Sequence, residues 1–114
     1  MSFAQKTEKL VNELIQAEYQ NACKQFGDKY NSLHEGYAVL LEEVEEVRKE
    51  IKHLKMDKKV FWNNIKENEM TVVEQMLIFL NEDVEDAIKE LAQTGAVLMK
   101  IRNTIVEMKE NEKL

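Results

Sequence analysis

The chain of 114 residues contains no proline, three glycines and a single cysteine. Little in it opposes helix formation, whereas Glu, Lys, Leu, Ala and Gln, which favour helices, are abundant. The lone Cys23 cannot form an intrachain disulfide. The sequence therefore predicts a single all-α domain spanning residues 1 to 114, with a core so modest that partner subunits would enlarge it.

The chain also lacks a surplus of basic residues and any long apolar run. Its formal net charge of −6 argues against general binding of nucleic acid, because such binding relies on a basic surface that displaces counterions from phosphates. No apolar run approaches the roughly twenty residues of a membrane span, and the first residues, MSFAQKTEKLVNEL, contain no uninterrupted apolar segment typical of a secretion signal. We therefore expect a soluble cytoplasmic protein that binds neither nucleic acid nor membranes.

Capping signals predict where the first two helices begin and end. Ser2 and Gln5 have the spacing of a capping box, and Gly27 is a natural helix end, so a first helix is expected between them. Ser32 and Glu35 form a second capping box, and the apolar residues that follow repeat every three or four positions. A second helix is therefore expected from about residue 33.

The remaining sequence predicts a connector and then one or two further helices. Between about residues 52 and 70 the apolar pattern loosens, which indicates a connector holding one short helix. From Val73 to Met108 apolar residues recur at heptad-like intervals, and the polar residues NED at 81 to 83 favour two stacked helices over one long helix. These elements predict an antiparallel four-helix-bundle-like fold that assembles into a homodimer or homotetramer.

An acidic ridge on the second predicted helix is the main candidate for a functional site. Like charges three or four residues apart on a helix repel one another. Neighbouring cations can partly neutralise Glu45 and Glu46, whereas Glu42 and Glu43 have no cation at that spacing. The ridge holds five glutamates within nine positions, namely Glu42, Glu43, Glu45, Glu46 and Glu50.

A second acidic ridge borders the apolar stripe near the C-terminal half of the chain. It consists of Asp83, Asp86 and Glu90. Carboxylates on facing helices form metal sites in helical bundles, and Mg²⁺ is bound by oxygen ligands. The spacing therefore permits a carboxylate metal site, and the alternative is that both ridges are solvated faces of acidic helices.

Two segments resemble a known enzyme family. The sequence LLEEVEEV, with Glu42, Glu43 and Glu46 in the pattern E-E-x-x-E, resembles the first motif of the MazG-like all-α nucleoside triphosphate pyrophosphohydrolases. The second motif of that family is E-x-x-D, and in ELAQTGAVLMK Glu90 matches its glutamate while Gln93 stands in place of its aspartate. Together with HEGYAVLLEEVEE, this segment resembles a small subgroup found in Gram-positive bacterial and phage genomes.

The resemblance implies hydrolysis of a nucleoside triphosphate, or of a modified one, to the monophosphate and pyrophosphate, with Mg²⁺ or Mn²⁺ as cofactor. The metal would screen the triphosphate charge and lower the pKa of a water molecule. The residues implied are Glu42, Glu43 and Glu46 for catalysis, and Glu43, Glu46 and Glu90 for the metal. Asp86 would compensate for the neutral side chain of Gln93.

Candidate substrate-binding residues lie near both motifs. Lys49, Lys52 and Lys55 continue the helix beyond the glutamates and could meet phosphate oxygens, although a solvated segment that offsets the acidic ridge is the alternative. Gln93 offers a carbonyl oxygen. Trp62 is either a core or interface anchor or a platform for a base.

Three other functions stay open at this point. A MazG-like protein that has lost catalysis would bind a nucleotide or a metal without turnover, as the neutral Gln93 suggests. A helical protein-interaction module would use the heptad-like seam to pair with itself or with a partner. A carboxylate-bridged di-iron site would need two E-x-x-H motifs, and Glu50 with His53 provides one.

Overall fold

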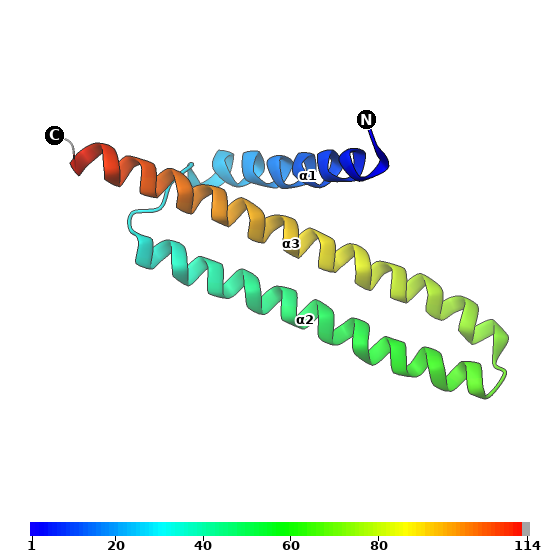
Figure 1. Cartoon of the computed structure of the whole chain (residues 1–114). Coiled ribbons are helices and arrows are strands. Elements are labelled where there is room, and N and C mark those ends of the chain that lie inside the picture. The colour runs from blue at the N-terminus through cyan, green and yellow to red at the C-terminus, as the bar shows by residue number, and fades with distance from the viewer. Residues whose placement is uncertain (113–114) are drawn as a thin grey trace. The chain divides into compact units, whose positions relative to one another are not determined.

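The computed structural model describes residues 1 to 112, and within them the chain is all-α, with three long helices and no sheet (Figure 1). Helix α1 spans Phe3–Phe26, α2 spans Leu33–Lys66 and α3 spans Met70–Glu112. The prediction of an all-α protein is thus confirmed. None of these helices is both long and apolar enough to span a membrane.

The predicted ends of α1 and the start of α2 are confirmed. The Ser2 hydroxyl accepts a hydrogen bond of 3.2 Å from the Gln5 N–H, and the Gln5 side chain accepts one of 2.8 Å from the Ser2 N–H. Gly27 ends α1 at a φ of 79°, which glycine adopts without steric cost. The Ser32 hydroxyl accepts a hydrogen bond from the Glu35 N–H at the start of α2.

The predicted connector at residues 52 to 70 is wrong, because α2 continues without a break to Lys66. The stripe of α2 that packs inward includes Asp57 and Asn64, both half-buried. These two polar residues hide the helical period from a count of apolar residues. The actual turn is short, and Asn68 adopts a left-handed φ of 57° there, a conformation that asparagine tolerates better than most residues.

The predicted break at residues 81 to 83 is also wrong, since α3 is one helix of 43 residues. The side chains that suggested a cap are used otherwise. The Asn81 amide donates a hydrogen bond of 2.9 Å to the Glu85 carboxylate one turn further along the helix. The side chain of Asp83 forms a hydrogen bond with that of Asp57 on α2. Residues of the types that favour a helix cap therefore make polar side-chain contacts here, inside a continuous helix.

The chain divides into two compact units. The three-helix unit comprises Met1–Val44 and Leu91–Leu114, and so contains α1, the start of α2 and the last part of α3. The hairpin unit comprises Glu45–Glu90, where the rest of α2 turns back into the first part of α3.

Two glycines let the helices of the three-helix unit approach closely. A Cβ atom on Gly95 of α3 would lie 3.0 Å from Cγ2 of Ile15 on α1. A Cβ atom on Gly36 of α2 would lie 2.9 Å from Cγ1 of Ile101 on α3. The small residues near Gly95 thus serve packing within the chain, since Ala92 and Ala96 are buried there as well.

The hairpin unit is held by a mixed interface. Met76 and Ala87 of α3 are buried, and Leu54 and Phe61 of α2 are half-buried. Asp83 is half-buried among them, and its hydrogen bond to Asp57, together with desolvation and the charge of Asp57, raises its pKa from 3.8 to about 6. Two carboxyl groups can form such a bond when they share a proton.

This shared proton predicts a pH-dependent stability. The folded protein binds a proton at Asp83 more tightly than the unfolded chain, so this contribution is fully present below about pH 4 and is lost as the pH rises through about 6. An Asp83→Asn variant keeps a donor for Asp57 at every pH. Above pH 7 we expect it to be more stable than the parent by an amount on the order of 1 kcal/mol, a figure reduced for partial exposure to solvent.

Urea unfolding at pH 4 and pH 8, followed by circular dichroism, measures this difference. The extra stability of Asp83→Asn over the parent should shrink toward zero at pH 4. Glu82→Gln, a change at an exposed position of the same helix, should show a stability difference that does not depend on pH. An equal stability difference at both pH values would contradict the shared proton.

Candidate functional site

A pocket of about 630 Å³ opens within the three-helix unit. All three helices and the turn between α1 and α2 contribute to its wall. Its charged residues are four glutamates and two lysines, namely Glu18, Glu35, Glu42, Glu43, Lys29 and Lys100. The other residues that line it are Asn21, Ala22, Gln25, Phe26, Tyr30, Val39, Gln93, Ala96 and Val97.

Three of the residues predicted from the sequence meet in this pocket. Glu42 and Glu43 reach it from α2, and Gln93 reaches it from α3. Glu43 and Gln93 are half-buried, whereas Glu42 is exposed. The two sequence segments that carry the family resemblance thus each contribute to one wall of the same pocket.

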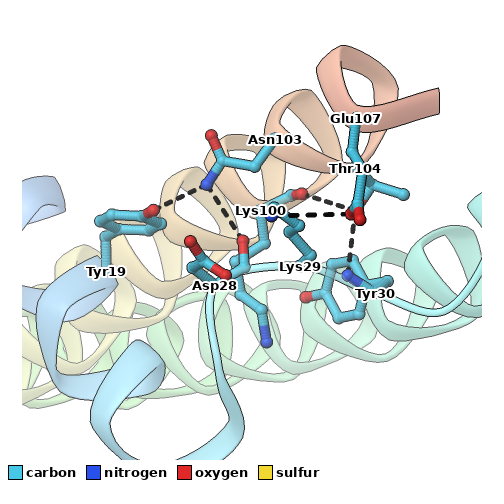
Figure 2. A network of polar contacts seen from close by, with 8 residues as sticks. All are labelled: Tyr19, Asp28, Lys29, Tyr30, Lys100, Asn103, Thr104 and Glu107. Atoms are coloured by element: carbon cyan, nitrogen blue, oxygen red, sulfur yellow. Dashed lines mark hydrogen bonds and ion pairs between the residues drawn. The ribbon is translucent and has the colours of Figure 1, made fainter. Parts of the chain in front are cut away.

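The turn that closes one side of the pocket is fixed to α3 by hydrogen bonds (Figure 2). The Tyr30 N–H donates to the Thr104 hydroxyl at 2.9 Å, and that hydroxyl donates to the Lys100 carbonyl at 2.9 Å. The Asn103 amide donates to the Tyr19 hydroxyl at 2.7 Å and to the Asp28 carbonyl at 3.0 Å. These bonds hold Tyr30 in place against the pocket wall.

Lys100 is the buried cation of the pocket. The residue is 5% exposed, and its Nζ lies 4.4 Å from the centre of the Tyr30 ring (Figure 2). Burying an ammonium group costs free energy, which the electron-rich face of an aromatic ring offsets in part. A negatively charged ligand in the pocket would offset more of that cost.

Tyr30 lies close to this cation, and the charges of Glu43 and Glu35 act on its hydroxyl. Burial raises the pKa of its hydroxyl, and the negative charges of Glu43 and Glu35 raise it further. The phenol therefore stays neutral at physiological pH and keeps a proton to donate. The pocket thus combines a neutral donor, a buried ammonium group and several carboxylates.

The other predicted site residues belong to the hairpin unit. Glu46 is half-buried and its carboxylate lies 3.2 Å from Lys49 Nζ, while Glu45 lies 3.4 Å from Arg48, so the predicted neutralisation of both glutamates is confirmed. Lys49 is thereby engaged by a carboxylate. Lys52 and Lys55 are exposed, as is Asp86, while Glu90 is half-buried.

Trp62 is 56% exposed and stacks against a cation instead of filling a core. The Nζ atom of Lys66, one turn further along α2, lies 5.7 Å from the centre of its ring. The prediction that Trp62 anchors a core is therefore wrong for the isolated chain. An interface anchor is compatible with this exposure.

Residues 1 to 112 contain no group of three or more Asp, Glu, His or Cys side chains arranged to hold a metal ion. The four-carboxylate metal site of Glu43, Glu46, Glu90 and Asp86 stays a prediction. Within the three-helix unit the adjacent carboxylates Glu42 and Glu43 have the oxygen chemistry that Mg²⁺ prefers.

Sequence reasoning missed Lys100, Tyr30 and Lys29. The signal for Lys100 was present, because it lies seven residues after Gln93 on a face that also holds Ala96 and Val97, where a lysine is out of place. Tyr30 gave no signal, since its position depends on the bond to Thr104, which lies 74 residues away in the sequence.

Comparisons with known proteins add no assignment. No protein-family model matches the chain, and no curated protein or solved structure matches it.

Proposed function

We propose that the protein is a Mg²⁺-dependent nucleotide pyrophosphohydrolase that cleaves a nucleoside triphosphate, or a modified one, to the monophosphate and pyrophosphate. The observation that carries the proposal is the meeting of Glu42 and Glu43 with the buried Lys100 in one pocket. A triphosphate with its metal carries both signs of charge, and this pocket offers partners for both.

Each group in the pocket has a role in this proposal. Glu42 and Glu43 hold Mg²⁺, which screens the phosphate charge and lowers the pKa of a water molecule. Lys100 binds phosphate oxygens that the metal leaves uncovered, whereas Lys29 is paired with Glu107 at 3.6 Å. The neutral phenol of Tyr30 donates a hydrogen bond to the substrate and keeps Lys100 in place.

The resemblance adds residues outside the pocket to this proposal. Glu46 and Glu90 are further metal ligands on that basis, Asp86 is a substitute for the absent aspartate, and the catalytic set is Glu42, Glu43 and Glu46. We also propose a cytoplasmic location and a homodimer or homotetramer with a four-helix-bundle-like, MazG-like core.

The test is a hydrolysis assay with purified full-length protein. A panel of ordinary and modified nucleoside triphosphates is incubated with Mg²⁺, with Mn²⁺ or with EDTA, and monophosphate and pyrophosphate are quantified. Pyrophosphate formed with Mg²⁺ and absent with EDTA supports the proposal. Release of orthophosphate alone, or no turnover with any nucleotide, contradicts it.

Gln93 gives a prediction specific to this chain. Gln93 supplies an amide oxygen where the family motif has a carboxylate, so the site has one negative charge fewer. We expect Gln93→Asp to lower the apparent Mg²⁺ concentration for half-maximal activity by about tenfold, the effect expected of one further charged oxygen ligand. A Mg²⁺ titration of the hydrolysis rate measures the shift.

The control for this prediction is Gln25→Glu, which adds the same charge to the pocket wall from α1. If both variants shift the Mg²⁺ dependence equally, the effect is a general one of negative charge. If Gln93→Asp needs the same Mg²⁺ concentration as the parent, Gln93 does not lie near the metal.

The neutral Gln93 also favours a second candidate function, a nucleotide- or metal-binding protein without turnover. Calorimetry with a nonhydrolysable triphosphate and Mg²⁺ would then show binding, while the hydrolysis assay would detect no product. Detectable turnover excludes this candidate.

A further inference from the structure

Glu18 is the carboxylate that α1 contributes to the pocket of the three-helix unit. The residue is half-buried, whereas Glu8 and Glu13 on the same helix are exposed. Within residues 1 to 112, the side chain of Glu18 forms neither an ion pair nor a hydrogen bond. Removing a carboxylate from water without giving it a partner costs free energy, so Glu18 is available to a ligand or a water molecule in the pocket.

Two close contacts relate the heights of the helices in this unit. Ile15 of α1 lies against Gly95 of α3, and Ile101 of α3 lies against Gly36 of α2. Helices α1 and α3 run in the same direction, whereas α2 runs in the opposite direction (Figure 1). Each contact is therefore a starting point from which heights on two helices can be compared, at a rise of about 1.5 Å per residue.

These heights bring the carboxylates of Glu18 and Glu43 to the same level of the pocket. Glu18 lies three residues beyond the contact on α1, and Glu43 lies seven residues beyond the contact on α2, so their Cα atoms differ in height by about 6 Å. Side chains lean toward the N-terminus of their own helix, and on antiparallel helices these two therefore lean toward each other. Helix α1 thus presents a carboxylate at the level where α2 presents the proposed metal ligands.

The other carboxylates of the pocket are less suited to take a proton from water. Glu42 and Glu43 are the proposed holders of the metal, and a carboxylate next to a cation is a weaker base. Glu35 lies seven residues before Glu42, about 10 Å away along α2 and in the first turn of that helix. The described part of the chain holds no group of three carboxylates arranged for a metal, so Glu18 does not complete a ligand set with Glu42 and Glu43.

We propose that Glu18 is the general base of the hydrolysis and takes a proton from the water that attacks the triphosphate. This inference rests on the function proposed above. The water oxygen forms a bond to one of the two phosphorus atoms beside the oxygen that bridges the α- and β-phosphates, and the bond from that phosphorus to the bridging oxygen breaks. The bridging oxygen keeps the electron pair, the monophosphate and pyrophosphate separate, and Glu18 passes the proton on to solvent.

The test is Glu18→Gln, which keeps the shape of the side chain and removes its ability to take a proton. We expect kcat for pyrophosphate release to fall by at least about 100-fold, the lower end of the range for general-base catalysis. Calorimetry with a nonhydrolysable nucleoside triphosphate and Mg²⁺ should show binding at least as tight as in the parent, because the variant removes a negative charge from the pocket. A loss of kcat without a loss of binding is the signature of a group that acts in the transition state.

Two further variants of α1 complete the experiment. Glu13→Gln removes the same charge from an exposed position that does not line the pocket and that pairs with Lys9 at 3.9 Å, so it should keep the parental kcat. Glu18→Asp keeps a base on a shorter side chain, and its kcat should lie between those of Glu18→Gln and the parent. Circular dichroism verifies that all variants keep the helix content of the parent.

The possible outcomes separate this role from the function on which it rests. A parental kcat in Glu18→Gln overturns the role of Glu18 and leaves the proposed function intact. A loss of triphosphate binding that matches the loss of kcat also overturns it, because Glu18 would then hold the substrate or the pocket instead of taking a proton. If the parent releases no pyrophosphate from any nucleotide, the proposed function fails, and the role of Glu18 fails with it.

Discussion

Replacing Glu43 with glutamine is expected to reduce pyrophosphate release from a nucleoside triphosphate by at least about 100-fold at saturating Mg²⁺. The substitution keeps the shape of the side chain and removes its negative charge from the pocket wall that also holds Lys100. Loss of that charge weakens the hold on the metal, and a neutral amide cannot assist removal of a proton from the attacking water. Initial rates over a range of Mg²⁺ and nucleotide concentrations measure the effect.

Glu45→Gln is the matched control for this prediction. Glu45 lies on the same helix and carries the same charge, but it is exposed, pairs with Arg48 at 3.4 Å and does not line the pocket. The control should therefore hydrolyse nucleotides at the parental rate. Equal rates in the parent and both variants would show that the pocket is not the site of hydrolysis, even if the protein were active.

Lys100 explains why the pocket is a better basis for function than the acidic ridge alone. Acidic residues on a helix surface are common, and charge pairs such as Glu46 with Lys49 show that part of this ridge is simply solvated and paired. A lysine that is 5% exposed is uncommon. Burying its ammonium group costs free energy, which a surface lysine that serves only solubility would not incur. Binding of an anionic ligand would offset that cost.

The helix ends were predictable from sequence because capping is local chemistry. Ser2, Gln5, Gly27 and Ser32 each act on a backbone group within four residues. The helix interiors were harder to predict, because Asp57 and Asp83 are polar residues at inward positions. Their contact joins two helices, and a pattern that counts apolar residues reads each of them as a break.

The site was predictable to the extent that a motif marked it. Glu42, Glu43 and Gln93 were found through the family resemblance, and they lie in one pocket. Tyr30 became part of that pocket through the fold, since its N–H is held by a hydroxyl 74 residues away. No local pattern in a single sequence encodes such a distant pair.

Replacing Gly36 with valine is expected to lower the free energy of unfolding by about 2 to 3 kcal/mol, the upper part of the range for overpacking a core. Gly36 is buried on α2, and a Cβ atom there would lie 2.9 Å from Cγ1 of Ile101 and 3.1 Å from Cδ2 of Tyr30. Neither neighbour is a flexible chain end. Valine adds two methyl groups beyond that Cβ, so Tyr30 must move and its bond to Thr104 weakens.

Alanine at position 36 distinguishes the effect of steric overlap with Ile101 from the effect of helix propensity. Gly36→Ala gains up to about 1 kcal/mol from its higher helix propensity and adds the Cβ overlap alone, so it should lie much closer to the parent than valine. Ala38→Val, at an exposed position two residues further along α2, reports the intrinsic cost of a β-branched residue in this helix. Urea unfolding of the three variants at one pH gives the comparison. If Gly36→Val were no less stable than Ala38→Val, the close approach of α2 and α3 at Gly36 would be disproved, and with it the mechanism that holds Tyr30 beside Lys100.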